Sequence, residues 1–73
     1  MAQLTHDDYE RLERAVAHGQ RIVVYRRGTE YIVVPLALKV RGGREVIETR
    51  NPTTGDVMSL AVEELDSIEM VAP

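Results

Sequence analysis

The spacing of apolar residues changes once along the chain, near residue 20. Before this point apolar residues recur at intervals of three and four, which is typical of a helix with one buried face. Beyond it, apolar and polar residues alternate, which is the period of a β-strand. The pattern therefore predicts one N-terminal helix followed by a β-rich unit. The apolar face of the helix consists of Tyr9, Leu12, Ala15 and Val16.

The predicted helix, residues 6–18, carries a start signal and a stop signal. Thr5 can cap its N-terminus, and Asp8, three residues later, completes a short capping box. Gly19 can adopt the left-handed conformation that commonly ends a helix. Because its apolar face is narrow, we expect the helix to lie on the β unit rather than within it.

Five strands are predicted in the rest of the chain. The turn sequences RRGT, RGG and NPTTG separate the first four, since glycine, asparagine and proline favour turns. The segment EEL suits a single helical turn before the last strand. The expected strands span residues 20–27, 30–41, 44–50, 56–62 and 67–71.

The second predicted strand is the longest and contains Pro35 near its middle. Because proline has no backbone N–H, it belongs at a sheet edge or at a bend. Strict alternation along this strand predicts a core face of Ile32, Val34, Leu36, Leu38 and Val40. The same argument points Met58, Leu60, Val62, Ile68 and Met70 inward from the last two strands.

The order of the elements predicts a mainly β fold, with an N-terminal helix followed by a five-stranded antiparallel Sm-like β-barrel. We expect one domain over residues 1–73, with the helix at 6–18 and the barrel at 20–71. Closure is favoured because aliphatic residues occupy both faces of the first two strands and leave little surface for water. The alternative is an open antiparallel sheet with the helix across one face.

Length and composition limit the class of protein. A chain of 73 residues, 44% hydrophobic and 29% charged, is typical of one small globular domain. Its stability is expected to be only about 3–5 kcal/mol. The N-terminus lacks the basic and apolar regions of a signal peptide, and the longest apolar run is too short to cross a bilayer. We therefore expect a cytoplasmic protein with no membrane association.

The sequence contains no pattern typical of an enzyme or a metal site. It has no cysteine, and its two histidines are twelve residues apart on the predicted helix. Neither serine lies in a nucleophile motif. The pair Gly42–Gly43 reads as a hairpin turn rather than a phosphate loop. We therefore expect a non-catalytic protein with no catalytic, cofactor-binding or metal-binding residues.

Charge is unevenly distributed, although the net charge is only −3. Residues 20–50 carry seven basic and three acidic residues, and both flanking segments are acidic. A tyrosine beside arginines supplies the stacking and phosphate neutralisation that single-stranded nucleic acid requires. Ordinary cross-strand packing is the alternative role for the same residues. The candidate binding surface consists of Tyr25, Arg26, Arg27, Tyr31 and Arg44.

Residues 12–71 resemble the Sm-like barrel of the WYL domain family. The similarity lies in the helix leading into IVVY, in Val33, Val34, Pro35 and Leu38, in the GGR hairpin, and in the closing VEELDSIEMV. The segments DDYERLERAVAH and LAVEELDSI are similar, more weakly, to the Rof family, small acidic Sm-like proteins that bind the termination factor Rho. The first resemblance implies a ligand-sensing role, and the second implies an acidic helix that blocks an RNA-binding surface.

Taken together, these observations predict a small regulatory or adaptor module that acts through protein contacts. A single-stranded nucleic-acid-binding or small-ligand-sensing barrel is the alternative. The expected partner is another protein, and edge strands offer a route to a homo-oligomer. Nucleic acid is the less favoured partner because the acidic flanks oppose the basic segment.

Overall fold

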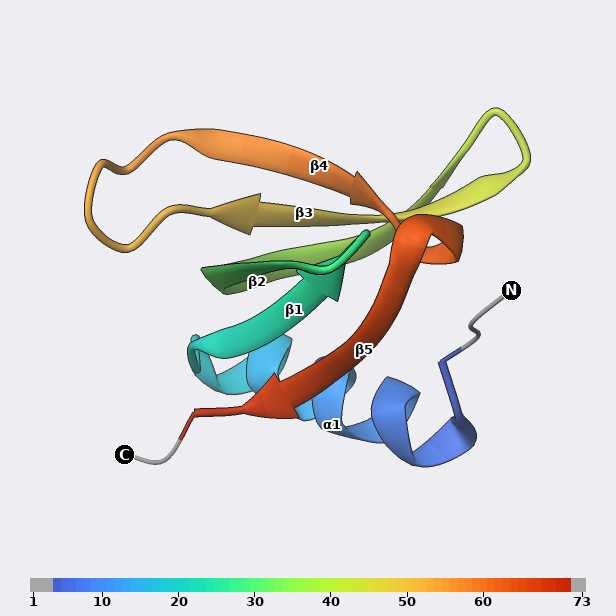
Figure 1. Cartoon of the computed structure of the whole chain (residues 1–73), viewed down its shortest axis with the longest axis horizontal. Helices are drawn as coiled ribbons and strands as arrows, with labels where there is room; N and C mark the ends of the chain where they lie inside the picture. The colour runs from blue at the N-terminus through green and yellow to red at the C-terminus, as the bar shows by residue number, and fades with distance from the viewer. Residues whose placement is uncertain (1–3, 72–73) are drawn as a thin grey trace.

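A computed structural model describes residues 4–71 of the chain, so the ends of the expected domain, residues 1–3 and 72–73, lie outside the described residues. The predicted helix and five antiparallel strands are confirmed (Figure 1). The last strand begins two residues earlier than expected. The elements are α1 (His6–His18), β1 (Ile22–Arg26), β2 (Thr29–Arg41), β3 (Arg44–Arg50), β4 (Val57–Ala61), η1 (Val62–Glu64) and β5 (Leu65–Met70).

The sheet is bent but is not closed into a barrel. Its strand order is β4-β3-β2-β1-β5, which places β4 and β5 at opposite ends. The short 3-10 helix η1 joins these two strands at one end, and they diverge beyond it (Figure 1). The expected closure is therefore not met, because β4 and β5 separate before they can pair along their length.

The bend in the sheet lies within β2. Residues 29–33 pair only with β1, and residues 34–41 pair only with β3. Between the two halves, the register shifts from Pro35 to Ala37 and leaves Leu36 as an extra residue. Such a bulge bends a strand and increases its twist. One long strand therefore belongs to both halves of the sheet.

Of the five β2 positions predicted to face the core, three are exposed, and a fourth, Val34, is buried but lies outside the core cluster. Ile32, Leu36 and Val40 are 49%, 43% and 70% exposed. Val33 and Pro35 are buried instead, and beyond the bulge Leu38 packs against the core. Side chains of a strand alternate between its two faces, and the extra residue interrupts this alternation. Even-numbered residues of β2 therefore lie on one face before Leu36 and on the opposite face after it.

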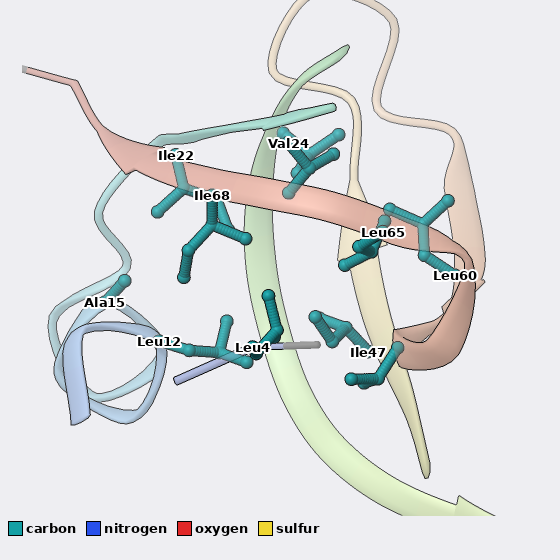
Figure 2. Close-up of a cluster of buried hydrophobic side chains, with 11 residues drawn as sticks. Leu4, Leu12, Ala15, Ile22, Val24, Ile47, Leu60, Leu65 and Ile68 are labelled. Atoms are coloured by element: carbon teal, nitrogen blue, oxygen red, sulfur yellow. The ribbon is translucent and has the colours of Figure 1, made fainter. Parts of the chain in front are cut away.

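The hydrophobic core lies between α1 and the concave side of the sheet (Figure 2). The predicted inward residues of β4, η1 and β5 are confirmed, since Leu60, Val62 and Ile68 are buried and both Met58 and Met70 pack against the cluster. The hydroxyl of Tyr9 on α1 also donates to Glu45 Oε1 on β3 at 2.7 Å. The buried cluster contains Leu4, Leu12, Ala15, Ile22, Val24, Val33, Ile47, Leu60, Val62, Leu65 and Ile68.

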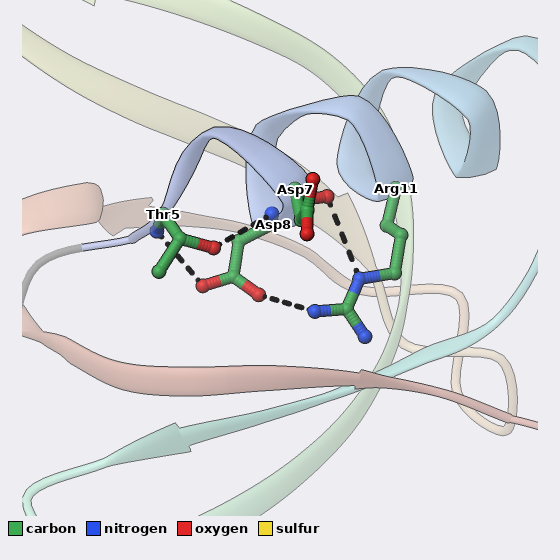
Figure 3. A network of polar contacts seen from close by, with 4 residues as sticks. All are labelled: Thr5, Asp7, Asp8 and Arg11. Atoms are coloured by element: carbon green, nitrogen blue, oxygen red, sulfur yellow. Dashed lines mark hydrogen bonds and ion pairs between the residues drawn. The ribbon is translucent and has the colours of Figure 1, made fainter.

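Both helix caps form as predicted, and Figure 3 shows the one at the N-terminus. Thr5 Oγ1 accepts a hydrogen bond from the Asp8 N–H at 3.1 Å, and Asp8 Oδ2 accepts one from the Thr5 N–H at 2.9 Å. The other carboxylate oxygen of Asp8 accepts from Arg11 at 2.7 Å. Gly19 ends the helix with φ +62°. These local bonds satisfy backbone groups that a helix end leaves unpaired.

The Asp8→Asn variant is expected to be less stable than the wild type at neutral pH and equally stable in acid. The hydrogen bond from the Thr5 N–H, aided by Arg11, holds the pKa of Asp8 below its ordinary value of 3.8. A lowered pKa in the folded state stabilises the protein above the unfolded-state pKa, and this stabilisation is lost as pH falls through the folded-state value. Urea unfolding at pH 7 should show a loss of roughly 0.5–1 kcal/mol.

Asp7→Asn is the matched control, since Asp7 lies in the same turn of α1 but outside the capping box. It should keep the capping bonds and lose only the interaction with the helix dipole. A difference between Asp8→Asn and wild type that persists unchanged at pH 2.5 would contradict this account.

Candidate functional site

Four of the five candidate residues lie on the β1–β2 hairpin. Tyr25 and Arg26 end β1, Arg27 lies in the turn, and Tyr31 lies on β2. Arg27 and Gly28 have φ values of +51° and +79°, as the two central residues of a tight hairpin turn require. The Arg26 guanidinium lies 5.9 Å from the centre of the Tyr31 ring, within the range of a cation–π contact.

The fifth candidate, Arg44, begins β3 on the other hairpin, and η1 brings it into one group with Arg26 and Arg27. Glu63 pairs with Arg44, whereas Glu64 lies 3.8 Å from Arg26 and 4.0 Å from Arg27. We call these three arginines and two glutamates the arginine–glutamate cluster. Two adjacent carboxylates of η1 thus form ion pairs with arginines of both the β1–β2 and the β2–β3 hairpin.

The pairing of arginines with carboxylates changes the interpretation of the basic segment. Exposed ion pairs contribute only about 0–1 kcal/mol each to stability, but they offset charge locally. Lys39 and Arg41 likewise share Glu48, and the bonds from Lys39 and Arg41 lower the pKa of that carboxyl. Within residues 20–50, the basic residues with a carboxylate partner are Arg26, Arg27, Lys39, Arg41 and Arg44.

The two candidate tyrosines lie on opposite faces of their hairpin. Tyr31 is opposite Val24 in the ladder and packs against the core. Tyr25 is opposite Glu30, and its hydroxyl donates to Glu30 Oε2 at 3.2 Å, which raises the pKa of Tyr25. Because successive residues of a strand point to opposite faces, the two rings cannot stack consecutive bases on one surface.

A groove of about 430 Å³ lies beside the first half of β2, and sequence reasoning missed it. It exists because β3 leaves β2 beyond the pair Val34–Arg50, so residues 30–33 have a strand on one side only. The proline in the middle of β2 indicated a bend. A bend separates β3 from the first half of β2, and this loss of pairing was not predicted. The groove, called here the β2-edge groove, is lined by Glu30, Tyr31, Ile32, Val33, Thr49, Asn51, Asp56 and Met58.

The β3–β4 turn holds one wall of this groove in place. Asn51 Oδ1 accepts hydrogen bonds from the N–H groups of Thr53 and Thr54 at 2.8 and 3.1 Å. The Asn51 carbonyl accepts from the Gly55 N–H, and the Asn51 N–H donates to the Asp56 carbonyl, both at 2.8 Å. These bonds fix the backbone of Asn51 and Asp56, whose side chains are exposed.

Neither histidine lies in an arrangement suited to a metal. His6 pairs with Glu10 at 2.8 Å, and His18 Nδ1 lies 3.0 Å from the Arg14 carbonyl. Within residues 4–71, no group of three or more histidine, aspartate or glutamate side chains is placed to hold a metal ion. In the same part of the chain, no helix has the length and apolar character needed to cross a membrane.

The arginine–glutamate cluster and the β2-edge groove differ in chemical character. The first is built from charges that offset one another, and the second from an unpaired strand edge. The chain matches no protein-family model and no curated protein.

Proposed function

We propose that the protein is a small, non-catalytic regulatory or adaptor module that acts in the cytoplasm through contacts with another protein. The observation that carries this proposal is a group of exposed apolar side chains on the outer face of the sheet. Ile32 and Val57 are 49% and 63% exposed, and the register places both on the same face as Val34. A contiguous patch of exposed apolar side chains marks an interaction surface on a protein.

Nucleic acid is the weaker candidate partner because the arginine–glutamate cluster offsets most of its own charge. Binding to a phosphate backbone depends on the number of cations free to neutralise phosphates. Three arginines of the cluster share two carboxylates, and the two tyrosines lie on opposite faces of the hairpin. A single-stranded nucleic-acid site requires free cations and aromatic rings on one surface. The cluster and the two tyrosines meet both requirements poorly.

An Sm-like fold with an unclosed sheet remains part of the proposal. It is supported by the order of the elements: a helix, then strands that pair antiparallel with their neighbours, with a 3-10 turn before the last. The resemblance of residues 12–71 to the WYL domain family supports it as well. The proposed role, however, rests on the exposed apolar face and not on that resemblance.

Capture from cell extract, with and without nuclease, tests the proposed function. Immobilised wild-type protein should retain the same polypeptides after the extract is treated with ribonuclease and deoxyribonuclease. The Ile32→Glu/Val57→Glu variant should lose them, whereas Val40→Glu, at a site 70% exposed elsewhere on β2, should keep them. Release of the bound polypeptides by nuclease would refute direct protein binding.

Removing the two carboxylates of η1 is expected to create nucleic-acid affinity that the wild type lacks. The Glu63→Gln/Glu64→Gln variant frees Arg26, Arg27 and Arg44, and its affinity for a single-stranded oligonucleotide should rise about tenfold at low salt. Fluorescence anisotropy of a labelled oligonucleotide measures this change. Glu10→Gln/Glu13→Gln alters net charge equally on α1 and should have little effect. Tight binding by the wild type would contradict the shielding argument.

Self-association through edge strands stays a prediction. β4 and β5 each pair with a strand on one side only, and free edges of this kind can pair between copies. Light scattering at tens of micromolar protein distinguishes such an oligomer from the 8.2 kDa monomer. The Ser59→Pro variant should dissociate an oligomer formed through β4, because proline is tolerated at an edge but cannot donate to a new ladder. A monomer mass for the wild type would exclude this assembly.

A further inference from the structure

We propose that the β2-edge groove binds an extended, basic segment of a partner protein as an additional β-strand beside Glu30–Ile32 of β2. This inference rests on the proposed function and specifies its surface and the chemistry of the partner. It follows from the pairing of β2, the direction of its free backbone groups, and the charge of the groove.

Each half of β2 has a strand on one side only, but the two open sides differ in what lies beside them. In the half that pairs with β3, Leu38 shares a hollow with Glu13 and Val16 of α1, so the helix lies beside this half at that point. The half that pairs with β1 adjoins the β2-edge groove. The open side at residues 30–32 is therefore the one available to an added strand.

The backbone of this half presents hydrogen-bonding groups to the groove. In a two-residue hairpin turn the flanking residues, here Arg26 and Thr29, exchange backbone hydrogen bonds. Bonded and non-bonded pairs alternate along an antiparallel ladder, so the N–H and C=O groups of Glu30 and Ile32 point away from β1. No turn or loop hydrogen bond to these groups is found in residues 4–71. An extended peptide offers the matching donors and acceptors.

The inner side of the groove suits small apolar side chains. Tyr31 and Met58 pack against the core from this side, and Thr49 is fully buried. The Thr49 hydroxyl already donates to the Met58 carbonyl at 2.8 Å, so it needs no polar partner. Alternate residues of an added strand would therefore be apolar and would face Tyr31 and Met58.

The charge of the groove favours a basic partner. Glu30 and Asp56 both line it, and neither forms an ion pair within residues 4–71. Of the neighbouring cations, Arg26 is paired with Glu64. Arg50 lies on the same face of the sheet as Glu30, but it does not line the groove. Lysine or arginine at the other alternate positions of the peptide would lie beside the carboxylates, where opposite charge improves recognition.

A peptide titration tests the charge requirement. The probe is a fluorescein-labelled hexapeptide, Lys-Val-Lys-Val-Lys-Val, and its acidic counterpart with glutamate in place of lysine should not bind. Glu30→Lys/Asp56→Lys should weaken binding of the basic probe about tenfold or more. Glu10→Lys/Glu13→Lys makes the same change of charge on α1 and should leave binding unchanged. Equal binding by both double variants would overturn the proposal.

Backbone methylation of the probe tests strand addition itself. Two N-methylated versions of the basic hexapeptide carry the methyl groups on alternate residues, one version at each set of positions. An added strand bonds to β2 through one of its edges only, so one version should lose binding and the other should keep it. Equal effects of the two versions, whether loss or retention, would rule out pairing with the β2 edge.

The same variants separate failure of this inference from failure of the proposed function. If Glu30→Lys/Asp56→Lys captures the same polypeptides from nuclease-treated extract as the wild type, the groove assignment is wrong and the protein-binding function stands. If the hexapeptide binds as expected but the wild type captures no polypeptide, the groove assignment stands and the proposed function fails.

Discussion

Replacing Leu12 with aspartate is expected to unfold the whole protein and not to release α1 alone. Leu12 is fully buried, and it belongs to the cluster that joins α1 to every strand of the sheet. Truncating a buried leucine to alanine already costs about 2–5 kcal/mol, and a buried carboxylate costs more. A domain of this size has roughly 3–5 kcal/mol of stability to lose.

Amide hydrogen exchange distinguishes global unfolding from local release. In Leu12→Asp, amides of β1, β3 and β5 should exchange as fast as those of α1, because the strands lose the residue that covers their concave side. Arg14→Asp, at an exposed position of the same helix, should keep native protection. Strands that stay protected in Leu12→Asp would show that the sheet is stable without α1.

The Val33→Asp variant is expected to unfold, whereas Ile32→Asp keeps the fold. The two residues are neighbours on β2, but Val33 is 3% exposed and Ile32 is 49% exposed. Val33 lies opposite Ile22 in the ladder, and both side chains point into the core. An aspartate at Val33 would be a buried, unpaired charge, which costs several kcal/mol.

Circular dichroism and urea unfolding of the two variants provide the comparison. The Ile32→Asp variant should show a cooperative transition close to that of the wild type, since its carboxylate remains in water. If Ile32→Asp unfolds and Val33→Asp stays folded, the assignment of Val33 to the core face and Ile32 to the outer face is contradicted. That result would support the sequence-based prediction, in which Ile32 faces the core.

The parts of the fold that could be predicted from the sequence depend on nearby residues. The capping box of Thr5 and Asp8 closes within four residues, and the left-handed Gly19 directly follows the helix. The hairpin turns likewise depend on the residues at their tips, such as Gly42–Gly43 with positive φ at both positions. Local chemistry determines these features, so a sequence pattern suffices to find them.

The features that could not be predicted depend on contacts between distant residues. The bulge at Leu36 is determined by how β2 pairs with β3, and it reverses the expected core face over half the strand. The ion pairs of Glu63 and Glu64 depend on where η1 lies relative to both hairpins. The structure brings the candidate arginines together at η1, and their pairing with carboxylates could not be predicted from the sequence.

Parallel titrations followed by amide chemical shifts test most directly whether the protein recognises protein or nucleic acid. The wild type is titrated with the basic hexapeptide and, separately, with a single-stranded oligonucleotide, both at physiological salt. The account predicts that the peptide shifts the amides of Glu30, Ile32, Asn51 and Asp56, and that the oligonucleotide leaves Arg27 and Arg44 unchanged. Shifts at Arg27 and Arg44 with the oligonucleotide, and none in the β2-edge groove with the peptide, would contradict it.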